Sequence, residues 1–258
     1  MKDFYLPDRA LHAYLEKDWF DHIERATGKT EFTFAPFPAQ QLYCDYHEKF
    51  VGFLKDELTR ANLQPESVLE IGSALGRTFY ELAINMKSVR KATLVEPSKN
   101  MLSLFNRIFS WPDDSPLTIL KGNVDTAQVK LNTDPIRKAV EGIEVTTLNS
   151  PFADLKLGGQ KFDLVICSNV IDQCVDPLKL ADMLKAHCAP GGVVLLSCTY
   201  QWQQKYIGNA GHQIRDINEL FGSGWKPLGQ TNIPFQVRVY ERHWLSFLSH
   251  AVAYQLQH

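Results

Sequence analysis

The sequence feature that most constrains the fold is a regular alternation of short apolar segments and helical segments after residue 66. The apolar segments have the length of buried strands and comprise residues 67–71, 91–97, 143–148, 162–169 and 193–200. Apolar residues at helical spacing predict helices at 76–86, 98–109 and 176–188. Near-continuous apolar strands that alternate with amphipathic helices are typical of a parallel sheet with helices on both faces. The sequence therefore predicts an α/β fold.

Four regions lie outside this alternation. Residues 1–36 are rich in aromatic residues without regular spacing, whereas apolar residues in 37–61 recur at the spacing of a helix. Residues 111–142 contain several Pro and Asp residues and form an insertion before the third strand. Residues 244–257 alternate with period two, which favours a late antiparallel strand.

Composition and charge disfavour several classes of protein. The formal net charge is −2, so nothing draws the chain as a whole to nucleic acid or to an anionic membrane. The five cysteines are an odd number without CxxC spacing, which favours reduced thiols over disulfides or a zinc site. No apolar run has the length of a membrane span, and the first residues do not resemble a secretory signal. We therefore expect a cytoplasmic protein without a membrane, nucleic-acid or metal site.

The loop after the first strand has the composition of a ligand-binding turn. The strand runs into "EIGSALGRT", in which Glu70 precedes Gly72, Gly76 and Arg77. Ligands of open α/β sheets bind beyond the carboxyl ends of the strands, and glycines there allow close approach to the backbone. A dinucleotide fingerprint needs glycine at two positions that hold Ala74 and Arg77 here, which disfavours NAD and a dehydrogenase.

S-adenosylmethionine (SAM) fits this loop better than NAD because it has no phosphate to hold. Its amino-acid end suits a carboxylate and backbone groups, and the residues we expect to contact it are Glu70, Gly72, Ser73, Gly76 and Arg77. The second strand ends in Glu96 and Pro97, where a carboxylate can accept both ribose hydroxyls. The opposite interpretation is that the glycines are ordinary turn residues and that Glu96 only begins a helix. The agreement of these features at matching strand ends favours SAM as the cofactor.

The adenine of such a cofactor is expected near the end of the third strand. The segment "LNSPF" offers Asn149 and Ser150 as hydrogen-bonding groups and Phe152 as a stacking face.

The fourth strand ends in "CSNVIDQCVDP", which carries polar groups where a buried strand leaves the core. Asp176 directly precedes Pro177, so it has the position of a helix N-cap. Asn169 and Asp172 are not explained by capping. We therefore expect both at the edge of the sheet where the cofactor binds.

Four segments resemble, in order, the methyltransferase domain at the C-terminus of ovothiol synthases: "EIGSALGRTFYELA", "FDLVICSNVIDQCVDPLKL", "LLSCTYQWQQKYI" and "IPFQVRVYER". The resemblance covers roughly residues 65–258. The sequence departs from the family pattern where it has Ser73 for Cys, Glu96 for Asp and Thr199 for Pro, and it has no clear match to the family's Gly-Asp at the end of the third strand.

The resemblance implies a SAM-dependent methyltransferase domain at 65–258 that N-methylates the imidazole ring of a mercaptohistidine. It implies a Rossmann-like class I methyltransferase fold, with a mostly parallel seven-stranded sheet covered by helices on both faces. Residues 1–64 would then be an N-terminal helical segment that can close over the active site as a lid. Two alternatives stay open: a methyltransferase acting on another small nitrogen or sulfur nucleophile, and a non-catalytic SAM-binding protein.

The candidate catalytic residues are Asn169, which we expect to contact the cofactor, and Asp172. A carboxylate at Asp172 can accept the N–H of an imidazole and so leave the other ring nitrogen free to attack. The remaining candidates for contact with a small-molecule substrate are Tyr43, His47, Tyr200, Trp202, Tyr206 and Arg238. Among these, Arg238 is the candidate for a substrate carboxylate, because a guanidinium binds carboxylates bidentately.

Overall fold

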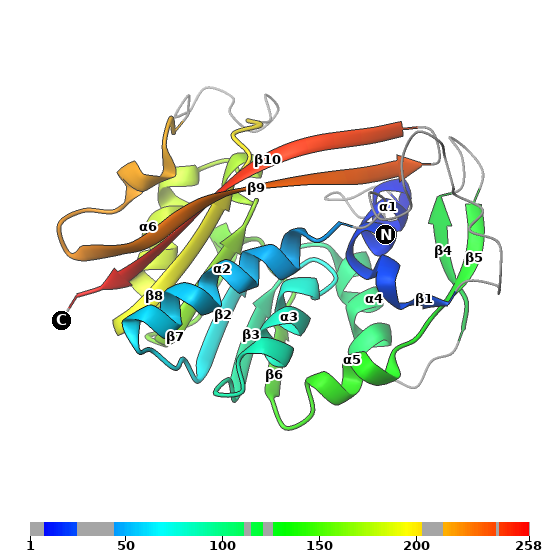
Figure 1. Cartoon of the computed structure of the whole chain (residues 1–258), viewed down its shortest axis with the longest axis horizontal. Helices are drawn as coiled ribbons and strands as arrows, with labels where there is room; N and C mark the ends of the chain where they lie inside the picture. The colour runs from blue at the N-terminus through cyan, green and yellow to red at the C-terminus, as the bar shows by residue number, and fades with distance from the viewer. Residues whose placement is uncertain are drawn as a thin grey trace.

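The computed structural model describes residues 8–24, 44–110, 115–120, 126–202, 214–240 and 243–257. A seven-stranded sheet forms its centre, in the order β6-β3-β2-β7-β8-β10-β9 (Figure 1). Its strands are β2 (Ser67–Ile71), β3 (Lys91–Val95), β6 (Glu144–Leu148), β7 (Phe162–Ser168), β8 (Cys188–Cys198), β9 (Trp225–Tyr240) and β10 (His243–Leu256). The five strands from β6 to β8 are parallel, whereas β10 is antiparallel to both β8 and β9.

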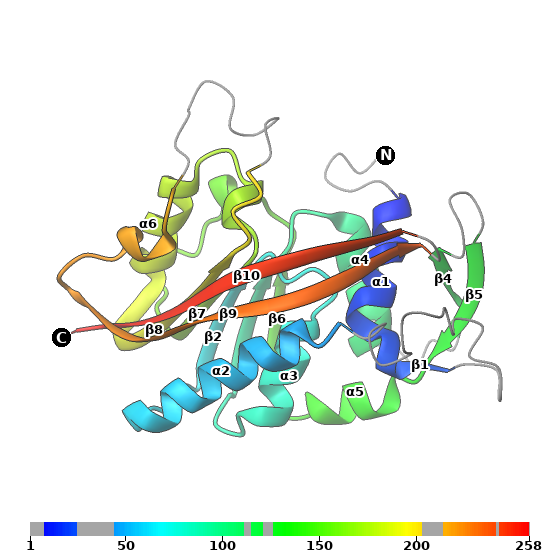
Figure 2. The same cartoon turned by 45° about the horizontal axis from the view of Figure 1, so that its top comes forward.

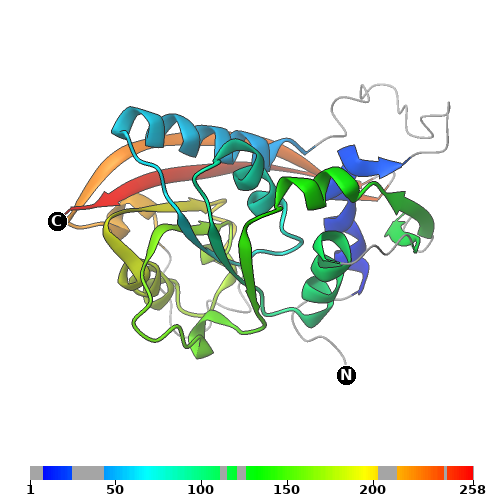
Figure 3. The ribbon, with the colours of Figure 1, turned by 90° about the horizontal axis from the view of Figure 1, so that it is seen from below.

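Helices cover both faces of this sheet, as the sequence predicts. On one face, α2 (Tyr46–Ala61) and α3 (Arg77–Asn85) bury apolar residues such as Phe50, Leu54 and Leu82 against alternate residues of the strands. On the other face, α6 (Pro177–His187) packs through Leu180 and Leu184 (Figure 3). The predicted Rossmann-like methyltransferase fold is therefore confirmed, including the late antiparallel strand β10.

The N-terminal part departs from the sequence-based expectation. An unpredicted helix, α1 (Asp8–Trp19), is followed by the short turn η1 (Phe20–His22) and by β1 (Ile23–Glu24). Trp19 is fully buried beside α3 and α4 (Lys99–Phe109), which explains why an aromatic-rich segment folds onto the domain. The predicted helix corresponds to α2, which begins at Tyr46; the two described residues just before it, Cys44 and Asp45, are not helical.

The predicted insertion forms a small sheet of its own. It contains β4 (Leu117–Leu120), β5 (Thr126–Leu131) and α5 (Asp134–Ala139), and β5 pairs with both β4 and β1. The insertion therefore fastens the N-terminal segment to the domain.

The β9–β10 hairpin is much longer than the sheet that it borders. The pairing of β10 with β8 ends at His250, whereas its pairing with β9 continues to His243. The hairpin runs past the end of β8 towards α1 and the small sheet (Figure 2). It contacts α1 through β9, so segments from the two ends of the chain meet beyond the carboxyl ends of the parallel strands. Among the described helices, none has both the length and the hydropathy of a membrane span.

Candidate functional site

The glycine loop between β2 and α3 is held over the end of β3. The backbone N–H groups of Gly72 and Ser73 both donate to the carbonyl of Val95, at 2.8 and 3.1 Å. The backbone has positive φ at Gly72 (77°), Ala74 (47°) and Gly76 (79°), so the chain turns sharply before α3 begins. Only Ala74 carries strain from this, because glycine has no side chain to clash in that conformation.

The two glycines are required for packing inside the protein as well as for the turn. A Cβ atom at Gly72 would lie 2.3 Å from Cγ2 of Val170, in the loop after β7. A Cβ atom at Gly76 would lie 2.5 Å from the ring of Phe105 in α4. The sequence analysis attributed both glycines to the approach of a ligand, whereas here protein side chains occupy the space that their missing side chains leave.

Glu96 joins the glycine loop to the end of β3. Its Oε2 atom accepts from the backbone N–H of Ala74 at 3.0 Å, and its Oε1 atom accepts from that of Ser98 at 2.9 Å. The amide of Asn149 donates to the carbonyls of Glu96 and Pro97, at 3.0 and 2.9 Å. The ends of β2, β3 and β6 are therefore held in one arrangement around the Glu96 carboxylate.

The other residues after β6 lie close by. Ser150 donates through its hydroxyl to the carbonyl of Pro151 at 3.0 Å. Phe152 begins the short helix η3 (Phe152–Asp154), and its ring is only partly buried against the core on the α6 face. The ring therefore keeps an accessible part of its surface.

Glu70 at the end of β2 is a buried carboxyl group with unused bonding capacity. It is 1% exposed, and burial raises the pKa of Glu70 to about 8, although a hydrogen bond with Thr78 opposes the shift. Its Oε2 atom has no hydrogen-bond partner among the described residues, and neither has the buried hydroxyl of Ser73. A cationic amine that donates hydrogen bonds would compensate both groups, which is the chemistry of the amino-acid end of SAM.

Behind Glu70 lies a network of buried charged groups that sequence reasoning missed. The Nδ1 atom of His47 lies 2.9 Å from the Thr78 hydroxyl, and its Nε2 atom lies 3.3 Å from Asp18. Lys17 forms an ion pair with Asp18. Burial by itself would raise the pKa of Asp18, but Lys17 and His47 outweigh it and hold this pKa at about 2. At His47, burial disfavours the charged imidazolium and lowers the pKa to about 4.

His47 is consequently a neutral, buried link between α1, α2 and α3, and the expected contact of its side chain with a substrate is not supported. Arg77 also differs from its prediction as a cofactor ligand. Its guanidinium donates to both carboxylate oxygens of Asp21, at 2.6 and 2.9 Å, and to Glu81 at 2.8 Å. It is 3% exposed and fastens the N-terminal segment to α3, so its side chain is not open to a ligand.

Asn169 stands at the end of β7 with a positive φ of 52°. Its Oδ1 atom accepts from the hydroxyls of Ser197 at 3.2 Å and Ser249 at 2.6 Å. The Tyr46 hydroxyl lies 2.7 Å from that of Ser197 and completes this cluster from α2. The cluster fixes the amide of Asn169, and its Nδ2 group has no acceptor among the described residues.

Asp172 has a different role from the one that its position in the sequence suggests. It is 1% exposed, and its Oδ2 atom accepts from the backbone N–H groups of Thr199 and Gln201, both at 3.2 Å. The Thr199 hydroxyl donates to the same oxygen at 2.6 Å. The carboxylate therefore ties the loop after β7 to the loop after β8, and it is not open to an acceptor molecule.

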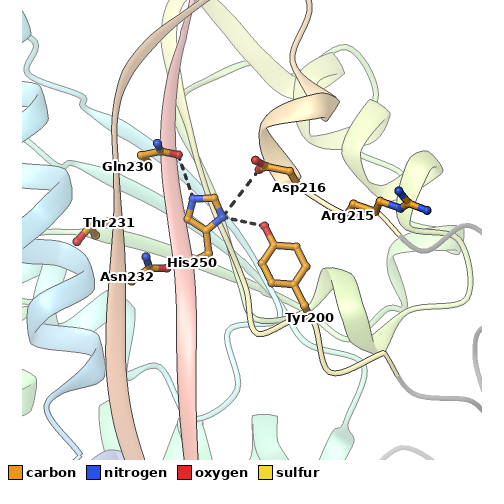
Figure 4. A pocket seen from close by; sticks show the side chains of 7 residues that line it. All are labelled: Tyr200, Arg215, Asp216, Gln230, Thr231, Asn232 and His250. Atoms are coloured by element: carbon orange, nitrogen blue, oxygen red, sulfur yellow. Dashed lines mark hydrogen bonds and ion pairs between the residues drawn. The ribbon is translucent and has the colours of Figure 1, made fainter.

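The loop that Asp172 holds presents Tyr200, which also has a positive φ of 57°. The Tyr200 hydroxyl bonds to Nδ1 of His250 at 2.8 Å, at the border of a cleft of about 600 Å³ (Figure 4). The cleft is lined by Tyr200, Arg215, Asp216, Gln230, Thr231, Asn232 and His250. Of these, the sequence analysis named only Tyr200. Trp202 packs partly buried against the core on the α6 face instead.

The side chains of three predicted substrate residues lie outside the described part of the structure. Tyr43 and Tyr206 lie outside the described residues. The backbone of Arg238 pairs with Trp244 in the extended part of the hairpin, whereas its side chain lies outside the described part.

Comparisons with known proteins agree with this geometry. A family model described as a methyltransferase domain matches residues 43–226. Among solved structures, the N-methyltransferase NodS from Bradyrhizobium japonicum WM9, in complex with S-adenosylhomocysteine, has a TM-score of 0.52 at 12% identity, covering 96% of this chain and 99% of that chain. A putative RNA methyltransferase from Pyrococcus horikoshii has a TM-score of 0.51 at 9% identity, covering 98% and 100%. None of the curated proteins compared with the sequence matches it.

The order of the strands and the loops at their ends are those of a Rossmann-like methyltransferase. The sequence identities to the two solved structures are so low that these likenesses show the fold alone. The chain belongs to the methyltransferase-domain family, whose model matches more than half of its length. The enzyme class expected from the sequence, a methyltransferase that uses SAM, is thereby confirmed.

Proposed function

We propose that this enzyme methylates a small molecule, with an imidazole nitrogen of a mercaptohistidine as the preferred acceptor. The resemblance of four segments to the methyltransferase domain of ovothiol synthases supports this substrate class. The observation that carries the proposal is the meeting of Glu70, Glu96 and Asn169 at the carboxyl edge of three neighbouring strands. When bound, SAM supplies an electrophilic methyl group on a sulfonium sulfur.

Glu70 and Ser73 hold the amino-acid end of the cofactor in this proposal. The Oε2 atom of Glu70 and the Ser73 hydroxyl lack partners among the described residues, and both are buried where an unpaired polar group costs about 1–3 kcal/mol. The backbone turn at Gly72 and Gly76 sets the direction of approach. We keep Arg77 only as a residue that fixes this turn.

Glu96 holds the ribose, because its two carboxylate oxygens face the backbone of both flanking loops and can each accept a hydroxyl. Pro97 and Asn149 keep this carboxylate in place, and Ser150 with the accessible face of Phe152 borders the adenine. Their common origin at the ends of β3 and β6 supports the assignment.

Asn169 lies on the side of the acceptor. Because its Oδ1 atom is occupied by two serine hydroxyls, its Nδ2 group is the part that is directed to a ligand. An imidazole nitrogen attacks only in its neutral form, so the site needs to hold it neutral and free of water. Asp172 acts as a positioning residue that fixes Tyr200 through the residues on either side of it.

The N-terminal segment covers this edge as the expected lid. Support comes from Tyr14 of α1: burial raises the pKa of Tyr14, and the negative charges of Glu96 and Asp172 raise it further. This coupling to the ends of both β3 and β7 is the support for placing the phenol near the same edge. The sequence analysis missed Tyr14 because the aromatic residues of 1–36 have no regular spacing that singles it out.

Calorimetry and product analysis test the proposal. SAM should bind in preference to NAD, and labelled SAM should transfer its methyl group to mercaptohistidine rather than to histidine, histamine or cysteine. Transfer to a different small nucleophile from a metabolite extract would keep the enzyme class and replace the substrate. SAM binding without transfer to any acceptor, including extracts, would favour the non-catalytic alternative.

A further inference from the structure

The cleft beside β10 is built from polar side chains of three separate parts of the chain. Tyr200 comes from the loop after β8, Arg215 and Asp216 precede the short helix η6 (Ile217–Leu220), and Gln230 and His250 lie on β9 and β10 (Figure 4). None of the described lining residues is aliphatic. Small-molecule sites are usually lined by apolar groups, so this lining indicates a small and highly polar ligand.

The hydrogen bonds around His250 define which of its ring nitrogens carries the proton. Gln230 accepts through Oε1 from the Asn218 amide at 2.8 Å, and the same oxygen lies 3.1 Å from Nε2 of His250. Nε2 is therefore the protonated nitrogen, because a carbonyl oxygen cannot donate. In this tautomer, Nδ1 is the nitrogen that accepts the hydroxyl proton of Tyr200, at 2.8 Å.

Tyr200 can accept a further hydrogen bond. Its oxygen accepts from the backbone N–H of Ile217 at 3.1 Å and donates its proton to His250, which leaves one lone pair. Burial raises the pKa of Tyr200 to about 12, so the hydroxyl keeps its proton at neutral pH. A ligand N–H in the cleft therefore meets an acceptor that is hydrogen-bonded to the His250 imidazole.

Two charges of opposite sign border the same cleft. Arg215 is exposed and has no ion-pair partner among the described residues. Asp216 accepts through Oδ1 from the backbone N–H and the amide of Asn218, both at 2.9 Å, whereas no described residue donates to its Oδ2 atom. A carboxylate and an ammonium group on one small molecule would match this pair.

The cleft also adjoins the edge where the methyl group is delivered. Tyr200 lies between Thr199 and Gln201, which Asp172 holds against the loop after β7. Ser249, which precedes His250 on β10, bonds directly to Asn169. His250 pairs with Cys198 at the carboxyl end of β8, so the cleft lies at the level of this edge, on the face of β10 opposite to Ser249 and Asn169.

We infer that this cleft binds the methyl acceptor as an α-amino acid, with Arg215 on its carboxylate and Asp216 on its ammonium, and that Tyr200 and His250 take up the proton released by methylation. This inference rests on the proposed function and assigns residues to the amino-acid part of its acceptor and to the proton that the acceptor releases. When the acceptor nitrogen forms its bond to the methyl carbon, the electron pair of the broken carbon–sulfur bond stays on sulfur. The acceptor then loses one proton to the Tyr200 oxygen while the Tyr200 proton moves to Nδ1 of His250. The imidazolium has Asp216 nearby, with Oδ1 3.9 Å from Nδ1, and it returns its proton to water.

Nuclear magnetic resonance of the histidine-labelled protein, loaded with S-adenosylhomocysteine, tests binding without turnover. The His250 signals, assigned with a His250→Gln variant, should show the Nε2–H tautomer and should shift on addition of L-histidine. Arg215→Ala should weaken that binding about tenfold, which is the loss of one good charge-assisted pair, whereas histamine should bind alike to both proteins because it has no carboxylate. Lys226→Ala, an exposed cation of β9 outside the cleft lining, is the matched control and should change nothing.

Steady-state kinetics with the acceptor that the enzyme is found to methylate complete the test. Arg215→Ala should raise KM for the acceptor about tenfold with little change in kcat, and His250→Gln should lower kcat about 100-fold with unchanged SAM affinity. Methylation that both variants perform like the wild type would overturn the inference and leave the proposed function standing. Shifts of His250 that depend on Arg215, in a protein that methylates nothing, would support the amino-acid site and refute the proposed function. The inference would be refuted if the His250 signals did not shift and no acceptor were methylated. It would also be refuted if His250 carried its proton on Nδ1.

Discussion

The two sides of the candidate active site differ in how deeply their polar side chains are buried. On the side of the glycine loop, Glu70, Asp18 and His47 are 1%, 2% and 9% exposed, and they form a network of charged and polar groups inside the protein. On the side of the cleft, the side chain of Asp216 is 49% exposed and that of His250 is 16% exposed. The first side is enclosed and the second is open to water.

This difference in burial indicates on which side residues can be substituted without loss of stability. Buried charges stabilise a fold only when every partner is present, so the glycine-loop side suits a ligand that never varies, such as the cofactor. Exposed polar groups cost little when they are exchanged, because water replaces a lost partner. The cleft side is thus the place where acceptor specificity can change.

The largest expected effect is at Asp172, which connects the two sides. Asp172→Ala leaves three donors of the loop after β8 without their acceptor and should cost about 3 kcal/mol in the free energy of unfolding, measured with urea. Asp172→Asn keeps an oxygen at the same place, so it should lose less stability but still lower turnover. The control Asp176→Ala removes only an exposed N-cap of α6 and should cost about 1 kcal/mol. Equal losses from both alanine variants would contradict the connection.

The next effect is at Gly72, where the glycine loop meets Val170. Gly72→Ala places a Cβ atom in the Val170 side chain at a positive φ and should destabilise the protein by about 2–3 kcal/mol. Gly158→Ala is the matched control: its φ is +59° but nothing lies within 4 Å, so it should cost only about 1 kcal/mol. If the double variant Gly72→Ala/Val170→Ala recovers part of the stability that Gly72→Ala loses, the clash with Val170 is the cause. Thermal unfolding of Gly72→Ala, Gly158→Ala, Val170→Ala and the double variant measures these losses.

Glu70→Gln should weaken SAM binding about tenfold, since a neutral amide replaces the carboxylate at the cofactor ammonium. Glu66→Gln, an exposed acid just before β2, should not change the affinity. Calorimetry in buffers of different ionisation enthalpy should further detect release of close to one proton per SAM bound at pH 7 by the wild type. The reason is that Glu70, with its pKa raised to about 8, is mostly protonated before a cation binds. Proton release that persists in Glu70→Gln would point to another group.

The same group predicts how stability depends on pH. The pKa of Glu70 is raised from its ordinary value of 4.5 to about 8, so between these values the folded protein holds a proton that the unfolded chain has released. Its contribution therefore makes the protein less stable as pH rises from about 4.5 to 8. Glu70→Gln should flatten this decline in urea unfolding without SAM. An unchanged slope would mean that Glu70 ionises normally in the folded protein.

The smallest expected effect is at Ala74, whose φ of 47° carries strain. Ala74→Gly should raise the free energy of unfolding by about 0.5–1 kcal/mol, because relief of the left-handed strain exceeds the added freedom of the unfolded chain. SAM affinity should not change, since the backbone N–H that Glu96 accepts is still present. The same change at Ala83 inside α3 should have the opposite sign, which differential scanning calorimetry would detect.

Several parts of the site could be found without a structure because they follow from local patterns. The glycine loop, Glu96 and Asn169 each stand directly after an apolar strand, and parallel strands bring their carboxyl ends to one edge. The same rule located Asp172 but misjudged its role, because a carboxylate near a site can as well be a ligand of the backbone as of a substrate. His47 and Arg77 were misjudged for a related reason: Asp18 of α1 and Asp21 of η1 bind them, and the aromatic-rich sequence did not reveal either element.

The sequence by itself determined the alternation of strands and helices and the class of enzyme, a methyltransferase that uses SAM, because these depend on neighbours along the chain and on the strand-end rule. Only the tertiary structure decided which polar residues share an environment. Arg215, Gln230 and His250 are separated by 15 and 20 residues and meet because β9 and β10 pair with each other beside η6. Such a meeting leaves no local signal, since a histidine in a strand of period two has the same pattern whether it faces water or a binding cleft.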